Sequence, residues 1–264
     1  QVSMQSFGGG IAVRGGSGST VTNVTMDRVT VLGNSAYKGG GIYADGNASV
    51  TAEEFLLANN QADYGAGVLT NFGSSDASVS VTNGIIACNA AELTAGGIQA
   101  GTAGRVSLAA VSFYGNTAGT GSLSSDGASA VRVTSGASVD MRRSVVFGAS
   151  ASYLLYGLGA GSVTTSYLFN ASGTNAQYGD VNDAVALGTG NAQRGDIVNG
   201  TWPPFTAASC NDNLADDDYR LIVQSGSGLL RMNDKRWGAF TDSDVPYVLS
   251  TDTGSERVWT PLIP

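Results

Sequence analysis

Apolar residues at every second position, interrupted by polar turns, dominate the first half of the chain. The clearest unit runs from Lys38 to Asn60. In it, Gly40-Gly41 leads into an apolar strand, a polar turn follows, and a second alternating stretch ends at the asparagine. A spacing of two is the side-chain period of a β-strand, whereas a helix repeats every 3.6 residues. The pattern therefore predicts short strands separated by tight turns.

This unit recurs along the chain, with less regular copies after about residue 120. Its closing asparagine stands at Asn34, Asn60, Asn89 and Asn116, which are 26, 29 and 27 residues apart. Self-similarity at a fixed period in this range is typical of a solenoid, in which each repeat packs on its neighbours. Valine, isoleucine, threonine and glycine are frequent in the units, which favours strands over helices.

We therefore predict an all-β fold, a right-handed parallel β-helix of about six or more coils with a C-terminal capping segment. Each unit has the length of one turn of three short strands, and turns stack about 4.8 Å apart, so that equivalent positions share a column. Two inward columns are expected: one with Val29, Phe55, Gly84, Val111 and then Val145, the other with Val31, Leu57, Ile86, Phe113 and then Phe147.

The closing asparagines Asn34, Asn60, Asn89 and Asn116 are expected to form a ladder at one corner. Asparagine tolerates the left-handed backbone conformation that a tight corner requires. Its amide can also bond to the amide of the next turn, as in other stacked β structures. The glycine pairs are expected where a Cβ would clash with a neighbouring turn.

Composition changes near residue 200, because all five prolines and all three tryptophans lie beyond it. Proline has no backbone N–H to donate to a central strand, and tryptophan has a large apolar side chain that can cover the end of a core. We predict an N-terminal strand at 1–7, β-helix coils at 8–175, and irregular coils, a cap and an extended arm at 176–264, all in one domain.

Charge narrows the range of partners. The chain has 264 residues, a net charge of −8 and no basic patch, so nucleic acid and anionic membranes are not expected partners. No apolar run reaches the length of a membrane span. The polar, lysine-poor composition favours an extracellular or cell-surface location.

Two cysteines are too few for a disulfide framework. Cys88 directly precedes a ladder asparagine, and Cys210 lies in the tail. The two residues could link the tail to the third coil. Two separate buried thiols are the simpler alternative.

The repeats resemble those of polymorphic outer-membrane proteins, which are β-helical surface adhesins. The similarity rests on the glycine-glycine-isoleucine starts and on Val31-Leu-Gly-Asn34, Ile86-Ala-Cys-Asn89 and Phe113-Tyr-Gly-Asn116, and it covers residues 8 to about 120. The resemblance implies a β-helix in a cell-surface context and implies no reaction.

The tail resembles the end of secreted β-helix proteins of environmental bacteria. Asp218-Tyr219-Arg220-Leu221 matches their closing motif. Gly226-Ser227-Gly228 and Trp237-Gly238-Ala239-Phe240 depart from it, since a proline and an isoleucine are replaced. This resemblance again implies a fold and a setting outside the cell.

Catalysis has few candidate residues, because the chain has no histidine. The best carboxylate pair is Asp27 with Glu53, which stacking would place one above the other at a spacing of about 5 Å, as in a retaining glycosidase. Arg28 is expected over Glu54 beside them. Acidic residues at such corners more commonly keep a solenoid soluble, so we expect no catalytic site. Asp212, Asp216, Asp217 and Asp218 are the candidates for a calcium site, but their spacing matches no loop motif and no cofactor is expected.

The function expected from these features is that of a non-catalytic adhesive or structural module. Its partners would be surface glycans, surface proteins or further copies of itself. Gln1 to Phe7 is too short for a helical lid, so we expect the first coil to be completed from outside, for instance by head-to-tail association into fibres. The alternative is a carbohydrate-active β-helix enzyme, a polysaccharide lyase or glycoside hydrolase, or a carbohydrate-binding module.

Overall fold

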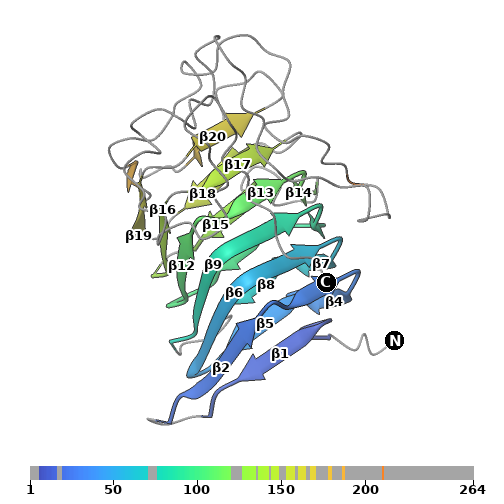
Figure 1. Cartoon of the computed structure of the whole chain (residues 1–264), viewed down its shortest axis with the longest axis vertical. Helices are drawn as coiled ribbons and strands as arrows, with labels where there is room; N and C mark the ends of the chain where they lie inside the picture. The colour runs from blue at the N-terminus through green and yellow to red at the C-terminus, as the bar shows by residue number, and fades with distance from the viewer. Residues whose placement is uncertain are drawn as a thin grey trace, which may run out of the picture.

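The computed structural model describes residues 6–16, 20–70, 76–119, 127–134, 136–142, 144–148, 153–157, 160–164, 167–170, 178–179, 186–187 and 210. These residues form strands and turns, with no helix among them. Neighbouring strands among these residues run parallel to each other. The strands stack turn upon turn from β1 and β2 at one end (Figure 1), so the all-β parallel solenoid is confirmed.

Three parallel sheets form the sides of the solenoid. The seven-stranded sheet contains β1 (Ile11–Arg14), β5 (Ile42–Asp45), β8 (Val68–Thr70), β11 (Ile98–Ala100), β15 (Ala128–Val133), β18 (Tyr153–Gly157) and β21 (Tyr178–Gly179). The four-stranded sheet contains β4 (Ser35–Lys38), β7 (Gln61–Tyr64), β10 (Ala90–Ala91) and β14 (Thr117–Ala118).

The eleven-stranded sheet has two arms that meet at a bend. Its first arm contains β2 (Thr22–Asp27), β12 (Arg105–Ala109), β16 (Ser138–Arg142), β19 (Ala160–Thr164) and β22 (Ala186–Leu187). Its second arm contains β3 (Thr30–Leu32), β13 (Ser112–Tyr114), β17 (Val145–Gly148) and β20 (Tyr167–Asn170). The long strands β6 (Ala48–Ala58) and β9 (Ser78–Ala87) continue through the bend and belong to both arms.

The solenoid has about four complete turns rather than the six or more expected. The four-stranded sheet sets this number, because it has a strand in each of the first four turns and none in the later described turns. The later turns add strands to the other two sheets only. The asparagine-ended unit that builds all the sides also fades at this point in the sequence.

The inward columns have the predicted register. Val31, Leu57, Ile86 and Phe113 are paired from turn to turn, and Phe55 is paired with Gly84. Phe55, Leu57, Ile86 and Phe113 have no exposed surface. Burial of such side chains stabilises the fold by about 1.5–3 kcal/mol each. Val29, in the first turn, is partly buried and packs against the same core.

The fifth turn is shifted by one residue relative to the prediction. Val146, and not Phe147, pairs with Phe113, and it is fully buried in the core cluster. The predicted positions Val145 and Phe147 pair instead with Ser112 and Tyr114. The sequence pattern placed apolar residues on both sides of the true position and so did not distinguish the two registers.

The left-handed backbone lies one residue before each ladder asparagine. Gly33, Asn59, Cys88 and Gly115 have φ values of 66°, 53°, 55° and 58°. The expectation that the ladder asparagines themselves adopt this conformation is therefore wrong. The role expected for the glycine pairs holds, because a Cβ on Gly97 would clash with the backbone oxygen of Ala130.

The N-terminal segment joins the edge of the four-stranded sheet. The amide of Lys38 donates to the backbone oxygen of Ser6, and the amide of Gly8 donates to that of Lys38. Of the segment predicted at 176–264, the described residues comprise β21, β22 and Cys210. The predicted cap and arm otherwise lie outside the described residues.

Candidate functional site

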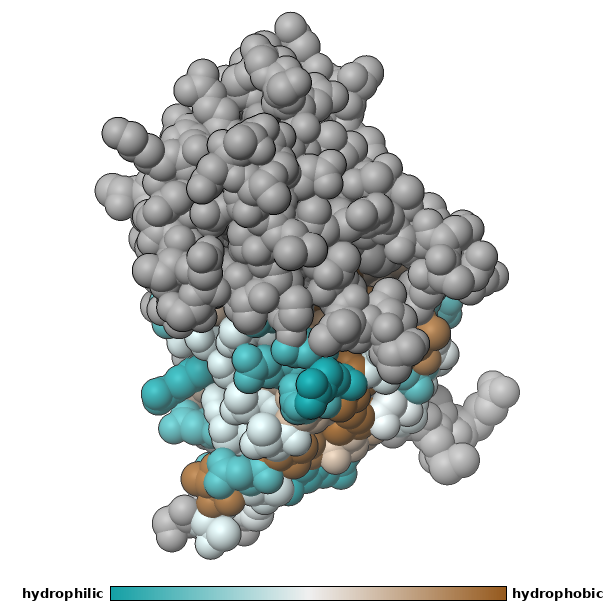
Figure 2. All heavy atoms as spheres, viewed as in Figure 1, coloured by the Kyte–Doolittle hydropathy of each residue, from teal (hydrophilic) through white to brown (hydrophobic). Residues whose placement is uncertain are grey.

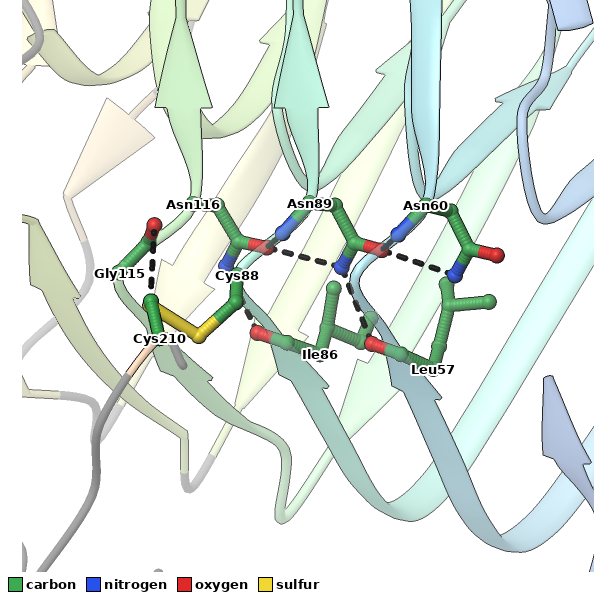
Figure 3. The surroundings of a disulfide bond; sticks show 8 residues. All are labelled: Leu57, Asn60, Ile86, Cys88, Asn89, Gly115, Asn116 and Cys210. Carbon is green, nitrogen blue, oxygen red and sulfur yellow. Dashed lines mark hydrogen bonds between the residues drawn. A yellow bond between two sulfur atoms is a disulfide. The ribbon is translucent and has the colours of Figure 1, made fainter. Parts of the chain in front are cut away.

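An asparagine ladder forms one corner of each of the first four turns. Figure 3 shows its members Asn60, Asn89 and Asn116. The Nδ2 atoms of Asn34, Asn60 and Asn89 each donate to Oδ1 of the asparagine in the next turn, at 3.0, 2.9 and 2.9 Å. The backbone amides of the same three residues donate to the same oxygens, each at 3.0 Å. Each of these side-chain oxygens therefore accepts two hydrogen bonds from the turn before it.

The ladder also bonds backward to the preceding turn. Asn60, Asn89 and Asn116 donate through Nδ2 to the backbone oxygens of Val31, Leu57 and Ile86. These three asparagines are essentially without exposed surface. Because a buried amide left without partners costs about 1–3 kcal/mol, the complete pairing explains how polar side chains are tolerated in the core.

A disulfide joins this corner to the tail. Cys88 and Cys210 are bonded, with Cα atoms 5.3 Å apart, and Cys88 directly precedes Asn89 (Figure 3). The Sγ atom of Cys210 lies 3.7 Å from the backbone oxygen of Gly115, one turn further along. A Cβ on Gly115 would clash with this sulfur, so the glycine makes room for the bridge. The alternative of two separate thiols is excluded by this bond.

The two residues of the predicted carboxylate pair are neighbours in register, but they lie at a corner that is open to solvent. Asp27 pairs with Glu53 between β2 and β6, and both residues are exposed. Arg28 contacts Asp27 at 2.9 Å, with more than half of each side chain exposed, and does not form the expected pair with Glu54. The column continues as Thr82 and Ala109, so no further acid joins it. Such an exposed ion pair contributes little to stability.

A second set of polar atoms lies at the bend of the eleven-stranded sheet. Oε2 of Glu54 and both amide atoms of Asn83 are buried and have no hydrogen-bond partner. The two residues occupy equivalent positions in neighbouring turns, with φ values of 52° each. Buried polar atoms without partners are uncommon, and each requires an explanation.

The metal candidates of the tail cannot be placed. Asp212, Asp216, Asp217 and Asp218 lie outside the described residues. Within the described part of the chain, no group of three or more cysteine and acidic side chains is arranged to hold a metal ion. The same part of the chain contains no helix long and apolar enough to cross a membrane.

An aromatic–cation cluster lies on the outside of the first two turns. It consists of Phe7, Arg14, Tyr37, Lys38, Tyr43 and Tyr64. Its centre is the Lys38 ammonium, which lies 5.4 Å from the ring centroids of Phe7 and Tyr37 and 5.8 Å from that of Tyr64. Tyr37 and Tyr64 also contact each other edge to face at 5.5 Å. An ammonium within about 6 Å of a ring face is attracted by its quadrupole.

Arg14 extends the cluster toward solvent. Its guanidinium lies 4.9 Å from the Phe7 centroid and 5.6 Å from that of Tyr43, and the side chain is exposed. Tyr43 donates its hydroxyl to Asp45 at 2.8 Å. On the face turned to the viewer in Figure 2, the hydrophobic residues of the described turns lie directly beside hydrophilic ones rather than forming one broad apolar surface.

Burial changes the ionisation of this cluster. Desolvation lowers the pKa of Lys38, with an opposing contribution from Asp45. Desolvation, followed by the hydrogen bond to Asp45, raises the pKa of Tyr43 well above its usual value. Desolvation and Tyr37 likewise raise the pKa of Tyr64. Deprotonation of Tyr43 and Tyr64 is therefore moved to a higher pH than that of a free tyrosine.

Comparisons with protein-family models, curated proteins and solved structures find no match for this chain. The similarity of its repeats to polymorphic outer-membrane proteins therefore stays a resemblance of short motifs.

The aromatic–cation cluster was not predicted from the sequence. Its members lie in four strands and in the bridge at Phe7, spread between residues 7 and 64, so no local motif marks them. A signal was nevertheless present, because Lys38 and Tyr64 occupy equivalent positions in successive turns and Tyr37 directly precedes Lys38.

Proposed function

We propose that this protein is a non-catalytic β-solenoid that works outside the cell or at its surface as an adhesive module. The disulfide between Cys88 and Cys210 supports the extracellular setting, because such bonds persist mainly in oxidising compartments. The stacked parallel sheets supply a stiff frame on which a contact surface can be carried.

The observation that carries the adhesive role is the aromatic–cation cluster. Phe7, Tyr37 and Tyr64 are half-buried, so their rings are held in place while part of each remains accessible. Arg14 is exposed beside them and offers several donors to a carboxylate or sulfate group. Rigid aromatic area with an adjacent guanidinium suits an acidic glycan of a cell surface.

The proposal can be tested on a glycan array with the whole protein. We expect binding to acidic glycans, and we expect Arg14→Ala to weaken this binding severalfold. The affinity should also fall as the salt concentration rises, because salt screens the attraction between the guanidinium and the acidic groups. Arg105→Ala is the matched control, since Arg105 is an exposed arginine on another side of the solenoid. Equal effects of the two substitutions would count against the cluster as the contact surface.

We propose no catalytic step, because Asp27 and Glu53 lie in an open, exposed corner. The check is a panel of pectin, alginate and glycosaminoglycan substrates, on which we expect no turnover above background. Turnover that Glu53→Gln abolishes would restore the glycosidase alternative.

End-to-end association is a second candidate role, and the first turn favours it. Strands β1, β2 and β3 each have a neighbour on one side only among the described strands. Among the described residues, Val21 and Leu32 in the same turn are the large apolar side chains with the greatest exposure, at 50% and 44%. An uncovered strand edge is a template for further pairing. Sedimentation at high concentration tests this role, and we expect Leu32→Lys to reduce association.

A further inference from the structure

A carboxylate lies next to the exposed cation of the aromatic–cation cluster. Arg14 and Asp45 are register partners in β1 and β5, and each directly follows a core residue of its strand, so both lie on the outer face of the sheet. Asp45 accepts the hydroxyl of Tyr43 at 2.8 Å and acts electrostatically on Lys38. A ligand on this surface therefore meets charges of both signs.

A second carboxylate lies at the other side of the cluster. Asp63 directly precedes Tyr64 in β7. Its charge adds to desolvation and to the contribution of Tyr37 in raising the pKa of Tyr64. Both Asp45 and Asp63 are partly exposed. A densely charged anionic chain on this surface would therefore be repelled by two carboxylates as well as attracted by the cations.

The two cations of the cluster are not equally accessible. Lys38 is 8% exposed, and its ammonium lies among three aromatic rings. Arg14 is exposed, and its guanidinium lies over the rings of Phe7 and Tyr43. An incoming ligand therefore meets one guanidinium and the aromatic surface beside it.

Arg14 also differs from two other arginines of the solenoid. Arg28 and Arg105 each form an ion pair with an aspartate. Among the described residues, no carboxylate lies within ion-pair distance of the Arg14 guanidinium, although Asp45 is its register partner. The planar fork of N–H donors on Arg14 is thus available to a ligand, and such a fork matches the two oxygens of one carboxylate.

We propose that the ligand of the aromatic–cation cluster is a glycan with one carboxylate per sugar, such as a chain of uronic acids, rather than a densely sulfated glycan. This inference rests on the proposed adhesive function and names its ligand class. The Arg14 guanidinium binds one carboxylate through two hydrogen bonds, and a half-buried ring beside it packs against the apolar face of the sugar. Asp45 and Asp63 disfavour further negative groups. Asp45 is then a specificity-determining residue, because it lies next to the bound carboxylate.

Calorimetric titration of the whole protein with oligosaccharides of equal length tests the ligand class. The probes are oligogalacturonate, the same oligosaccharide with its carboxylates methyl-esterified, and a heparin oligosaccharide. We expect oligogalacturonate to bind most tightly and esterification to weaken binding by about tenfold or more, because the charge-assisted hydrogen bonds are lost. Tighter binding of heparin that Arg14→Ala weakens would refute this inference and leave the proposed function standing. Binding of neither acidic probe would refute both.

Arg14→Lys tests the contact with the carboxylate. The variant keeps the positive charge and loses the planar fork, so we expect oligogalacturonate to bind severalfold more weakly. Arg105→Lys is the matched control on another side of the solenoid and should leave the affinity unchanged. Equal affinities of the Arg14→Lys variant and the unchanged protein would show that a point charge is sufficient, which would overturn the two-bond contact.

Asp45→Asn tests the origin of the specificity. The variant keeps an acceptor for the Tyr43 hydroxyl and removes the negative charge, so we expect the preference for oligogalacturonate over heparin to fall severalfold. Asp76→Asn, which removes the carboxylate beside Arg105, is the matched control and should leave the preference as it is. A preference that Asp45→Asn does not change, or that Asp76→Asn lowers equally, would refute the role given to Asp45.

Discussion

Two corners of the same turns differ in how they are held. The ladder corner is formed by Asn34, Asn60, Asn89 and Asn116, and the outer corner, at the bend of the eleven-stranded sheet, by Arg28, Glu54, Asn83 and Ala110. Both corners require one residue per turn in the left-handed conformation. At the ladder corner one residue type recurs and every interior amide is paired. At the outer corner four residue types follow one another, and buried polar atoms are left without partners.

The comparison separates two demands that a corner makes on the sequence. Left-handed backbone alone admits arginine, glutamate, asparagine and alanine in one column. Repetition of one residue appears only where side chains bond from turn to turn. At the ladder corner the two demands also fall on different residues, because the left-handed conformation is adopted by Gly33, Asn59, Cys88 and Gly115, each directly before a ladder asparagine.

The largest expected effect is the loss of one interior ladder residue. Asn89→Ala removes the acceptor of two donors on Asn60 and the donor to the backbone oxygen of Leu57. With about 1–3 kcal/mol for each buried group left unpaired, we expect a loss of about 3–5 kcal/mol in the free energy of unfolding. Urea denaturation measures it.

Asn83→Ala is the matched control at the outer corner. It removes an amide that has no partner, and the same column already contains Ala110 in this conformation. We expect a change within about 1 kcal/mol, because the strain of a left-handed alanine offsets the relief of a buried unpaired amide. Equal losses for Asn83→Ala and Asn89→Ala would remove the distinction between the corners.

A smaller effect is expected for the disulfide, which ties only the ladder corner to the tail. Its closed loop spans 122 residues, so Cys88→Ser/Cys210→Ser is expected to cost about 2–4 kcal/mol. Thermal unfolding under oxidising conditions measures the loss. An unchanged melting temperature would mean that the tail is held by its contacts and not by the bridge.

Alkaline pH distinguishes the ladder from the ionisable surface of the first turns. The ladder contains only amides, whereas the folded-state pKa of Tyr43 is raised. The folded protein then holds a proton that the unfolded chain releases, so stability falls as the pH rises above about 10, by up to about 1.4 kcal/mol per pH unit. Tyr43→Phe is expected to flatten this slope in denaturant titrations between pH 9 and 11. The pKa of Tyr64 is also raised, so part of the slope remains in the Tyr43→Phe variant.

The smallest effect is expected for a substitution that changes only the free-energy cost of a backbone conformation. Asn59 has a positive φ at the ladder corner, where the first and fourth turns have Gly33 and Gly115. Asn59→Gly relieves this strain but adds freedom to the unfolded chain, so we expect a change of no more than about 1 kcal/mol. Calorimetry measures it, and a larger loss would show that the Asn59 side chain itself contributes to the corner.

The fold could be predicted where the same physical demand recurs at a fixed spacing. The columns through Leu57 and Phe113 and the ladder asparagines could be read for this reason. The fifth turn could not, because an extra residue near Arg142 leaves both Val146 and Phe147 as apolar candidates for one column. A single pair of cysteines carries no information on distance, so the bridge from Cys88 was left open.

The burial of Leu56 and Ile85, which lie outside the core cluster, was not predicted, although the sequence contained a signal for it. Phe55-Leu56-Leu57 and Gly84-Ile85-Ile86 break the alternation with consecutive apolar residues. A continuous apolar run is typical of a strand that is covered on both faces. The aromatic–cation cluster gave no such local sign, because it depends on which turns are stacked.

The ladder also gives the solenoid an electrical direction. Every side-chain amide in it presents its oxygen to the preceding turn and its nitrogen to the following one, so the amide dipoles add along the stack. Bonds in such a chain polarise one another, which strengthens the interior links more than the terminal ones. The partial negative end of the column lies at Asn34 and the partial positive end at Asn116. A turn added below Asn34 would therefore be held best by a residue that presents N–H groups, and a copy turned end for end would meet oxygen with oxygen.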